Sequence, residues 1–512
     1  MENKLIEQFN KLQNAKNEDE IEDICFEINS LIGTKINAPR LFLLPEMLPY
    51  LQLGLDINTH PSVISLTLKN IGVLAKLSTE ETCSFLLHNK LVDPIFKLIT
   101  LDSISVSSSS SSLLAKILSV RNKGTDKFIE AIRKPFIELL VQQQQGDGNI
   151  VFRLLDLGSS VLIHQYRNES MINLDTDSYI LEQSNIDELE SHFTADAVKF
   201  KEIYLKTLED SINKGDELIE MNAIEIVQNI CSKAYGIKLM DKEGIFSKLY
   251  QQLNDSVLKP KDTQTLHRSL VFNKIIQVIC SIASSGGDLA CLFIFKNNDW
   301  MAIFQYHLVN SGELDISKRL LEKIISSIGP LGALNNGIQF LINHQPLIQN
   351  YAELILSNDT TISIATMISF SLMLDNLDKN SSNSDKYLQI YNYIPNSIFI
   401  SKIVKNLTNP IDEVKSSTLM LVNSLCMHSW GAADMIKVPG LLEYLLNRLN
   451  ENTKLFREWK FTIISTLVKY QQPLFQSTAE ERNRFLELKA YIAKGIHYIP
   501  SEAKVEIATQ DA

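Results

Sequence analysis

Residues 409–450 read NPIDEVKSSTLMLVNSLCMHSWGAADMIKVPGLLEYLLNRLN, and this stretch decides the fold. Its first half places apolar or small side chains at the spacing of one helix face: Val414, Thr418, Leu421, Val422 and Leu425. A short second segment follows over 430–436. Pro439 and Gly440 then interrupt the pattern, because neither residue favours continuing a helix. The stretch therefore predicts a long helix, a short helix and a turn.

A third helix is predicted directly after the turn, with a five-position apolar stripe: Leu441, Leu442, Leu445, Leu446 and Leu449. Three helices in 409–450 match the period of about 40–47 residues that is typical of HEAT and armadillo repeats. A unit this apolar cannot bury its stripe alone, so neighbouring units must stack on it.

The five-position stripe recurs elsewhere in the chain. Leu91, Val92, Ile95, Phe96 and Ile99 repeat its spacing, and Ile245, Phe246, Leu249, Tyr250 and Leu253 repeat it again. Imperfect copies begin at Ile132 and Trp300. Several copies at this spacing indicate an array of repeats rather than separate globular domains.

Composition fits a folded helical protein that binds other proteins. The 512 residues are 45% hydrophobic and 21% charged, with 19 Gly and 14 Pro, and the formal net charge is -11. A protein binds phosphate groups through clustered Lys and Arg side chains. The acidic net charge therefore argues against nucleic acid or an anionic membrane as a general partner. An acidic surface suits a protein partner that carries basic patches.

Cysteine usage and the N-terminus indicate the compartment. The six cysteines are scattered, mostly in apolar helical stripes, and form no CxxC pair, so we expect buried, reduced thiols. The first residues, MENKLIEQFN, contain no apolar signal core. The expected location is cytoplasmic, with a nuclear one also open.

The predicted fold class is all-α: a right-handed α-solenoid of HEAT/armadillo-like repeats over residues 1–500. We expect an N-terminal cap over 1–57, an acidic insertion over about 165–195 and a polar tail over 501–512. The serine run Ser107–Ser112 is interpreted as a loop entering the next helix, the alternative being a cluster of phosphorylation sites.

Motifs that carry catalysis are missing from the sequence. It contains no Gly-rich phosphate loop, no H-E-x-x-H and no G-x-S-x-G, so we expect no enzyme, no cofactor and no metal. The acidic pair Glu80 and Glu81 is interpreted as a solvated face. Helical-repeat arrays usually bind proteins on the surface of their stacked helices.

Two regions resemble a known family. The first contains Trp430, Pro439–Gly440, Glu443–Tyr444 and Arg448, and the second is Leu486–Pro500 with Tyr491, Gly495 and Tyr498. Upstream, His60–Pro61, Val63, Thr67–Leu68 and Ile71–Gly72 look like the family's first repeat. Together these residues resemble the 26S proteasome non-ATPase regulatory subunit 5 family, over about a fifth of the chain.

The resemblance implies a function and partners. Members of that family are HEAT/armadillo-like chaperones that assemble the base of the proteasome regulatory particle. They bind the C-terminal domain of one ATPase subunit, regulatory subunit 7, in a precursor module with a second ATPase and the large non-ATPase scaffold subunit. They are absent from the finished proteasome. The same mechanism here would prevent premature docking of the ATPase on the core particle.

Candidate partner-binding residues come from geometry, because no binding motif can be carried over from the family. If the third helix of each unit lines the inner face, a partner meets its polar stripe. That hypothesis selects Lys97, Lys248, Gln252, Glu443, Tyr444 and Arg448. Tyr444 and Arg448 are also spaced to stack only on one another. Two functional alternatives stay open: another helical-repeat adaptor in transport or signalling, and an enzyme with a helical-repeat body.

Overall fold

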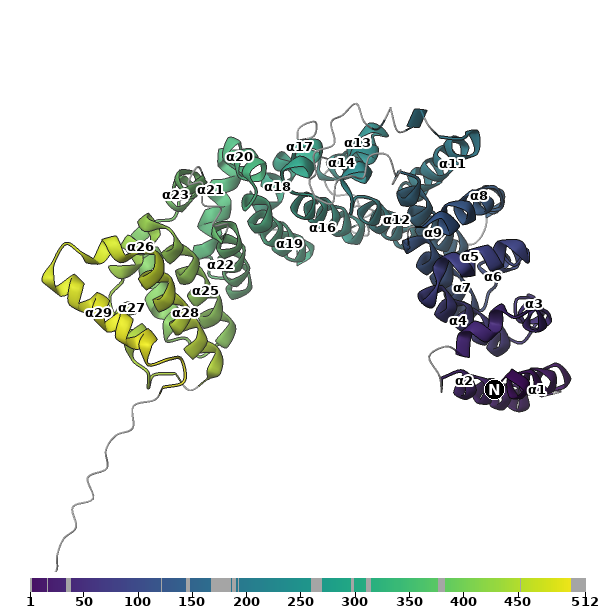
Figure 1. Cartoon of the computed structure of the whole chain (residues 1–512). Coiled ribbons are helices and arrows are strands. Elements are labelled where there is room, and N and C mark those ends of the chain that lie inside the picture. The colour runs from purple at the N-terminus through teal and green to yellow at the C-terminus, as the bar shows by residue number, and fades with distance from the viewer. Residues whose placement is uncertain are drawn as a thin grey trace, which may run out of the picture. The chain divides into compact units, whose positions relative to one another are not determined.

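The computed structural model describes residues 2–15, 17–33, 38–120, 122–143, 148–166, 186, 190–191, 193–258, 269–295, 299–309, 315–375, 383–451 and 453–498. Within these ranges every regular element is a helix (Figure 1). The prediction of an all-α fold is confirmed. The chain divides into two compact units, residues 1–245 and residues 246–512. One continuous array over 1–500 stays a prediction.

The first unit is built from the following helices: α1 (Glu2–Asn14), α2 (Glu18–Gly33), η1 (Ala38–Leu43), η2 (Pro45–Met47), α3 (Leu48–Gly54), α4 (Pro61–Leu77), α5 (Thr79–His88), α6 (Val92–Leu98), α7 (Ile104–Ser119), α8 (Lys123–Gln143), α9 (Gly148–Gln165), α11 (Ala195–Ile212), α12 (Glu217–Ile230) and α13 (Ala234–Lys242). Long helices pack in succession, α2 on α4, α4 on α7, α7 on α9 and α9 on α12. A second row, α5, α8 and α11, packs alongside them.

The second unit repeats this plan. Its helices are α14 (Ile245–Leu258), α16 (Ser269–Ser285), α17 (Gly287–Phe295), α18 (Trp300–Val309), α19 (Asp315–Gly332), α20 (Asn335–Asn343), α21 (Gln345–Glu353), η4 (Leu354–Leu356), α22 (Thr360–Leu374), α23 (Ser384–Tyr391), α24 (Asn396–Leu407), α25 (Asp412–Met427), α26 (Ser429–Ile436), α27 (Leu441–Leu446), α28 (Lys454–Tyr470), η6 (Gln472–Phe475) and α29 (Ala479–Ala493). The largest contacts join α16, α19, α22, α25 and α28 in that order. In Figure 1, α19, α22 and α25 lie on one side of the unit, and α20, α23 and α26 on the other.

This stack of long helices is the repeat that the sequence predicts. In α25 the predicted stripe residues Val414, Thr418, Leu421 and Leu425 are all buried. In the second unit each of the long helices α16, α19, α22 and α25 is followed by a short one, as α26 follows α25, and Gly440 makes the predicted turn with a φ of 77°. The helical-repeat prediction is confirmed within each unit, and burying one stripe against the next is what holds the stack together.

The third helix of the opening stretch is shorter than predicted. α27 ends at Leu446, and Leu449 is 59% exposed instead of filling the fifth stripe position. Two asparagines end the helix by bonding main chain: Asn447 Oδ1 accepts from the Leu449 amide at 2.9 Å, and Asn450 Nδ2 donates to the Tyr444 carbonyl at 3.0 Å. Such side-chain bonds compete with helix continuation. Arg448 therefore lies outside the helix on which it was predicted.

The serine run is also not a loop. Ser107–Ser112 lies wholly within α7. Ser107 donates to the Ser103 carbonyl at 2.9 Å and Ser110 to the Ile95 carbonyl at 2.6 Å, so these two buried hydroxyls have acceptors. Packing of Val106, Leu113 and Ile117 then outweighs the weak helix propensity of serine. The predicted acidic insertion lies largely outside the described residues, and the predicted tail 501–512 lies outside them altogether.

Candidate protein-binding site

None of the six residues predicted from the sequence lies on the main stack of long helices. Lys97 is exposed on α6 in the first unit. Lys248 and Gln252 lie one turn apart on α14 and are half-buried. Glu443 and Tyr444 lie on α27, and Arg448 follows it. The main stack within each unit is formed by the long helices. That the third helix of each unit lines an inner face that a partner meets stays a prediction.

Arg448 holds the C-terminal end of α29 in place. Its guanidinium donates to three main-chain carbonyls, those of Gly495 at 2.8 Å, Tyr498 at 3.0 Å and Tyr491 at 2.5 Å. Its central carbon lies 3.7 Å from the centroid of the Tyr491 ring, a cation–π contact. The predicted stacking of Arg448 on Tyr444 is replaced by these bonds. Arg448 has a structural role, and contact with a partner stays a prediction for it.

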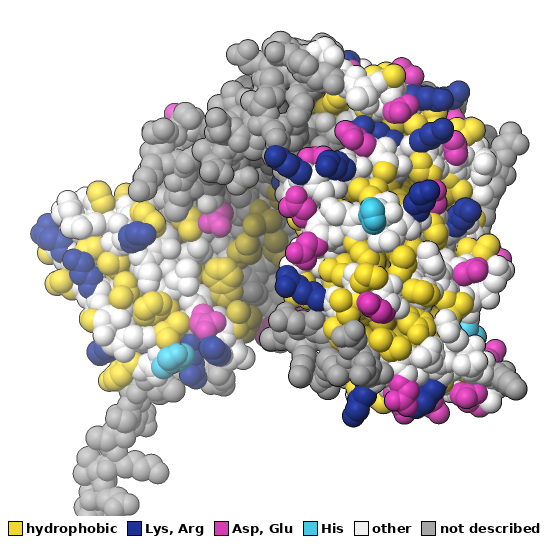
Figure 2. Space-filling view, turned by 45° about the vertical axis from the view of Figure 1, so that its right-hand side comes forward, with side chains coloured by type: hydrophobic (Ala, Val, Ile, Leu, Met, Phe, Trp, Pro, Cys, Tyr) yellow, Lys and Arg dark blue, Asp and Glu magenta, His cyan; other side chains and the backbone are white. Residues whose placement is uncertain are grey.

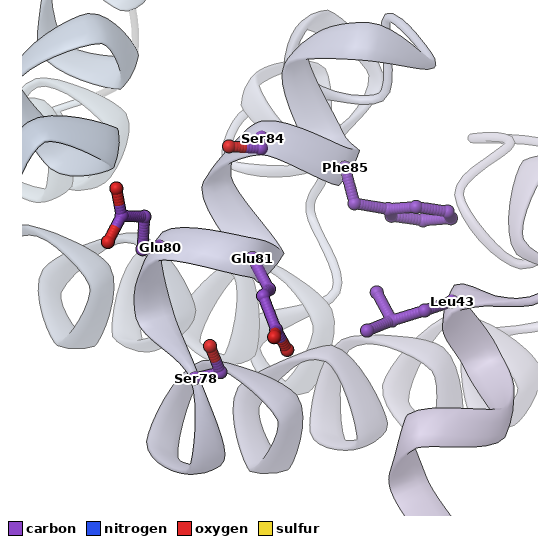
Figure 3. A pocket seen from close by; sticks show the side chains of 6 residues that line it. All are labelled: Leu43, Ser78, Glu80, Glu81, Ser84 and Phe85. Atoms are coloured by element: carbon purple, nitrogen blue, oxygen red, sulfur yellow. The ribbon is translucent and has the colours of Figure 1, made fainter.

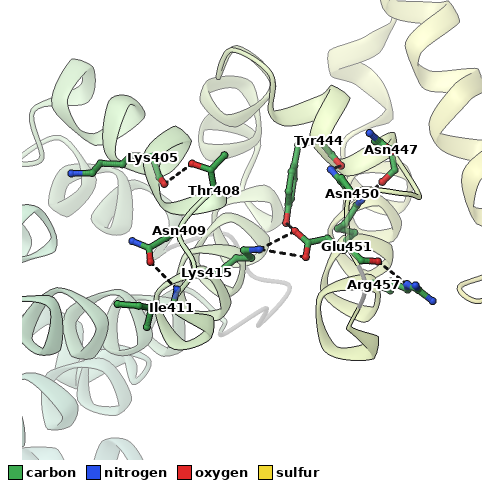
Figure 4. A network of polar contacts seen from close by, with 11 residues as sticks. Lys405, Thr408, Asn409, Ile411, Lys415, Tyr444, Asn447, Asn450, Glu451 and Arg457 are labelled. Atoms are coloured by element: carbon green, nitrogen blue, oxygen red, sulfur yellow. Dashed lines mark hydrogen bonds and ion pairs between the residues drawn. The ribbon is translucent and has the colours of Figure 1, made fainter.

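Tyr444 belongs to a buried polar network between α25 and α28 (Figure 4). Its hydroxyl donates to Glu451 Oε1 at 2.6 Å, and Lys415 Nζ reaches the same oxygen at 3.1 Å. Arg457 Nε donates to the Glu451 main-chain carbonyl at 3.0 Å. Burial, followed by the bond to Glu451, raises the pKa of the Tyr444 hydroxyl. The network ties Tyr444 and Glu451 to the long helices α25 and α28.

Lys460 extends this network beneath the Tyr444 ring. Its ammonium donates to the Asn447 carbonyl and to Asn450 Oδ1, and it lies 5.1 Å from the ring centroid of Tyr444. Burial lowers the pKa of Lys460 to about 8, and nearby Arg448 adds to this while Glu451 opposes it. A lysine with so low a pKa is a catalytic candidate in an open cleft. Here the side chain is buried and its donors are bonded to the chain itself, so the geometry favours a structural role.

Glu443 faces a shallow groove between α27 and α29. The groove holds about 300 Å³ and has Leu446 and Leu488 among its lining residues. Arg484 crosses it, lying 3.5 Å from Glu443 and 3.3 Å from Glu480. These pairs are exposed and contribute little stability. Glu443 is therefore accessible to a partner, as the sequence predicts for a binding residue.

A second groove, lined by Leu43, Ser78, Glu80, Glu81, Ser84 and Phe85, lies beside the start of α5. Figure 3 shows Leu43 and Phe85 facing each other, whereas Glu80 and Glu81 point in different directions. Both carboxylates are exposed, and Arg40 lies 4.0 Å from Glu81. Two acids that do not converge on one point cannot share a proton or flank a reacting bond. The interpretation of this pair as a solvated face is confirmed.

The sequence analysis missed the solvent face of the long helices. On α22 that face carries Thr361, Ile364, Ile368 and Leu372, and residues 360–374 contain no charged side chain. Ile364, Ile368 and Leu372 therefore leave an uncharged, partly apolar surface of this helix open to solvent. The absence of charge over 360–374 was the available signal for this surface in the sequence.

Other classes of site find no support in the described part of the chain. No group of three or more potential metal ligands occurs there. No helix among the described residues is long and apolar enough to cross a membrane. On the face seen in Figure 2, Lys and Arg side chains stand among Asp and Glu and hydrophobic ones instead of forming a continuous basic surface. Burial raises the thiol pKa of all six cysteines, for example to about 11 at Cys83, so none is an activated nucleophile.

Comparison with known proteins gives one family and several structural neighbours. A family model described as the proteasome non-ATPase 26S subunit matches residues 188–512. No curated protein matches the chain. Among solved structures, an engineered protein is 13% identical over 90% of this chain and 98% of its own, with a TM-score of 0.40. A designed armadillo repeat protein is 13% identical over 47% of this chain and 98% of its own, with a TM-score of 0.34.

Proposed function

Because the chain belongs to the proteasome non-ATPase 26S subunit family, we propose that it is a non-catalytic chaperone for assembly of the base of the proteasome regulatory particle. Its partner in this proposal is the C-terminal domain of the ATPase regulatory subunit 7, within a precursor module that holds a second ATPase and the large non-ATPase scaffold subunit. The bound chaperone prevents premature docking of that ATPase on the core particle. It works in the cytoplasm.

The observation that carries the proposal is the extent of the family match. It spans residues 188–512 and so includes the whole second unit, with its stack from α16 to α28. A stack of this kind offers a long side-chain surface built from successive helices, which suits recognition of a folded protein domain. A binding role is further supported by the buried thiols, whose raised pKa leaves no activated cysteine nucleophile among the described residues.

The first experiment tests the partner directly. The purified full chain is titrated with the isolated C-terminal domain of regulatory subunit 7, and the same domain from another base ATPase serves as the control. We expect saturable binding to the first domain and at least about tenfold weaker binding to the second. Equal binding to both domains would favour a general helical-repeat adaptor.

The second experiment tests the assembly role. The tagged chain is isolated from cells under mild conditions and the co-purifying subunits are identified. We expect free base precursors that contain regulatory subunit 7 and lack core-particle subunits. Recovery of complete proteasomes without enrichment of precursors would refute the chaperone mechanism.

The exposed residues Glu443 and Lys97 are the sequence-predicted positions that can be tested without disturbing the fold. Glu443→Lys is compared with Glu458→Lys, a change on α28 where Glu458 pairs only with Lys454 at 3.6 Å. If Glu443 contacts the partner, its reversal weakens binding by about tenfold while the control does not. Lys97→Glu tests the first unit in the same assay.

A further inference from the structure

An open groove crosses three successive long helices of the first unit, α2, α4 and α7. Phe26 of α2, Leu66 and Lys69 of α4, and Ser105 of α7 are among the side chains that line it. Its volume is about 380 Å³, near the small end of ligand-sized cavities, which suits a few side chains of a protein partner. We call it the N-terminal groove. It lies before residue 188, where the family match begins.

Phe26, which lines the groove, and Ile104, which is next in sequence to a lining residue, are the two most exposed large hydrophobic side chains among the described residues. Phe26 and Ile104 are each 75% exposed, and Ile104 directly precedes the lining residue Ser105. Elsewhere on α2 the apolar residues Ile24, Cys25 and Ile28 are buried, so Phe26 is not part of that helix's own packing. Exposed apolar side chains beside a concave surface mark a protein-interaction site.

The exposed acidic side chains of α2 indicate the charge of the segment that the groove would bind. α2 exposes Glu18, Asp19, Glu20, Glu22, Asp23 and Glu27 and carries no Lys or Arg. Acids in the first turn stabilise the helix dipole, which accounts for Glu18, Asp19 and Glu20. Glu22, Asp23 and Glu27 lie beyond that turn and surround Phe26 in sequence. Lys69 is the one basic side chain in the groove lining, and it bonds Asn29 at 3.4 Å.

We propose that the N-terminal groove docks a basic amphipathic segment of the partner protein, with apolar side chains against Phe26 and Ile104 and Lys or Arg side chains facing the carboxylates of α2. The exposed carboxylates of α2 disfavour an acidic segment or a nucleic acid, because they repel carboxylates and phosphates. The inference rests on the proposed function, since the segment belongs to the C-terminal domain of the ATPase. It adds a contact outside the family-matched region.

The first test removes the apolar contacts. Phe26→Ser with Ile104→Ser is expected to raise the Kd for the isolated ATPase C-terminal domain by about tenfold or more, because aromatic anchors dominate interfaces. Leu218→Ser is the matched control, since Leu218 is 65% exposed on α12 in the same unit and does not line the groove. All three positions are exposed, so thermal unfolding is expected to stay at the wild-type temperature.

The second test removes the charge. Glu22→Gln, Asp23→Asn and Glu27→Gln together are expected to weaken binding and to flatten its dependence on salt, since ion pairing is screened by salt. A photo-crosslinking residue placed at position 26 is then expected to capture a Lys- or Arg-containing segment of the ATPase domain.

The outcomes separate this inference from the proposed function. If the wild-type chain binds the ATPase domain and both groove variants bind equally well, the inference is overturned and the function stands. If the wild-type chain does not bind the domain, both the proposed function and the groove inference are refuted. Self-association of the chain that the Phe26→Ser change abolishes would make a second copy the occupant and overturn the assignment.

Discussion

Gly329 of α19 lies directly against the main-chain carbonyl of Ser369 on α22. A Cβ atom at position 329 would sit 2.1 Å from that oxygen, so only a glycine allows this approach. From the other side, Ser369 Oγ donates to the Ile325 carbonyl of α19 at 2.5 Å and accepts from the Tyr351 hydroxyl at 2.8 Å. The two long helices are therefore in backbone contact at this point of the stack.

This contact predicts a large effect of a small substitution. Gly329→Ala is expected to lower the free energy of unfolding by about 1–3 kcal/mol, because the obstacle is backbone and cannot rotate away. The control is Gly72→Ala on α4, where the nearest atom would be Leu113 Cδ1 at 3.7 Å, an ordinary contact. It is expected to be neutral or to stabilise by up to about 1 kcal/mol. Urea unfolding of both variants checks the prediction, and equal losses would contradict it.

Arg448 provides the second prediction. Arg448→Ala leaves three carbonyls without their donor and removes the contact with Tyr491, so we expect a loss of about 2–3 kcal/mol and faster amide exchange at the end of α29. Arg448→Lys is expected to rescue little, because one ammonium cannot reproduce the guanidinium geometry. Arg482→Ala removes a single bond, to the Gln476 carbonyl, at the other end of the helix and is expected to cost less than about 1 kcal/mol. Comparable losses in both alanine variants would refute the role assigned to Arg448.

Lys460 predicts how stability depends on pH. The folded-state pKa of about 8 lies below the value near 10.4 of an unfolded lysine, so between these two pH values the unfolded chain binds more protons. The cost of burying the charge is fully present below pH 8 and disappears as the pH rises through about 10.4. Relative to Lys460→Met, wild-type stability should therefore increase across this window. Lys469→Met, at the exposed end of the same helix, is the control, and parallel curves for wild type and Lys460→Met would contradict the prediction.

The cysteines give a chemical test of the packing. Burial raises the thiol pKa to about 12 at Cys280 and Cys426 and to about 11 at Cys25. Reaction with an alkylating reagent at pH 8 needs the thiolate, so all six should react slowly in the folded chain and rapidly in denaturant. Mass spectrometry of alkylated peptides checks this site by site. Rapid labelling of one native cysteine would show that its helix opens locally.

The sequence predicted the long helices better than the short ones. Val414, Leu421 and Leu425 define a period that only a helix can bury on one side, and α25 confirms it. The end of α27 escaped prediction because Leu449 fits the period, while its exposure follows from main-chain bonds made by Asn447 and Asn450. For the candidate site, Glu443 is accessible as predicted, whereas Tyr444 and Arg448 are engaged by residues up to 50 positions away.

The sequence by itself determined the class of fold and the unit that repeats, because hydrophobic periodicity is a local property of the chain. Tertiary structure alone decided which helix of each unit joins the main stack. A long and a short amphipathic helix both present an apolar stripe, and only packing shows which stripe meets the next unit and which faces remain open. For the same reason Phe26 and Ser105, which lie 79 positions apart in the sequence, line one groove only after α2, α4 and α7 have stacked.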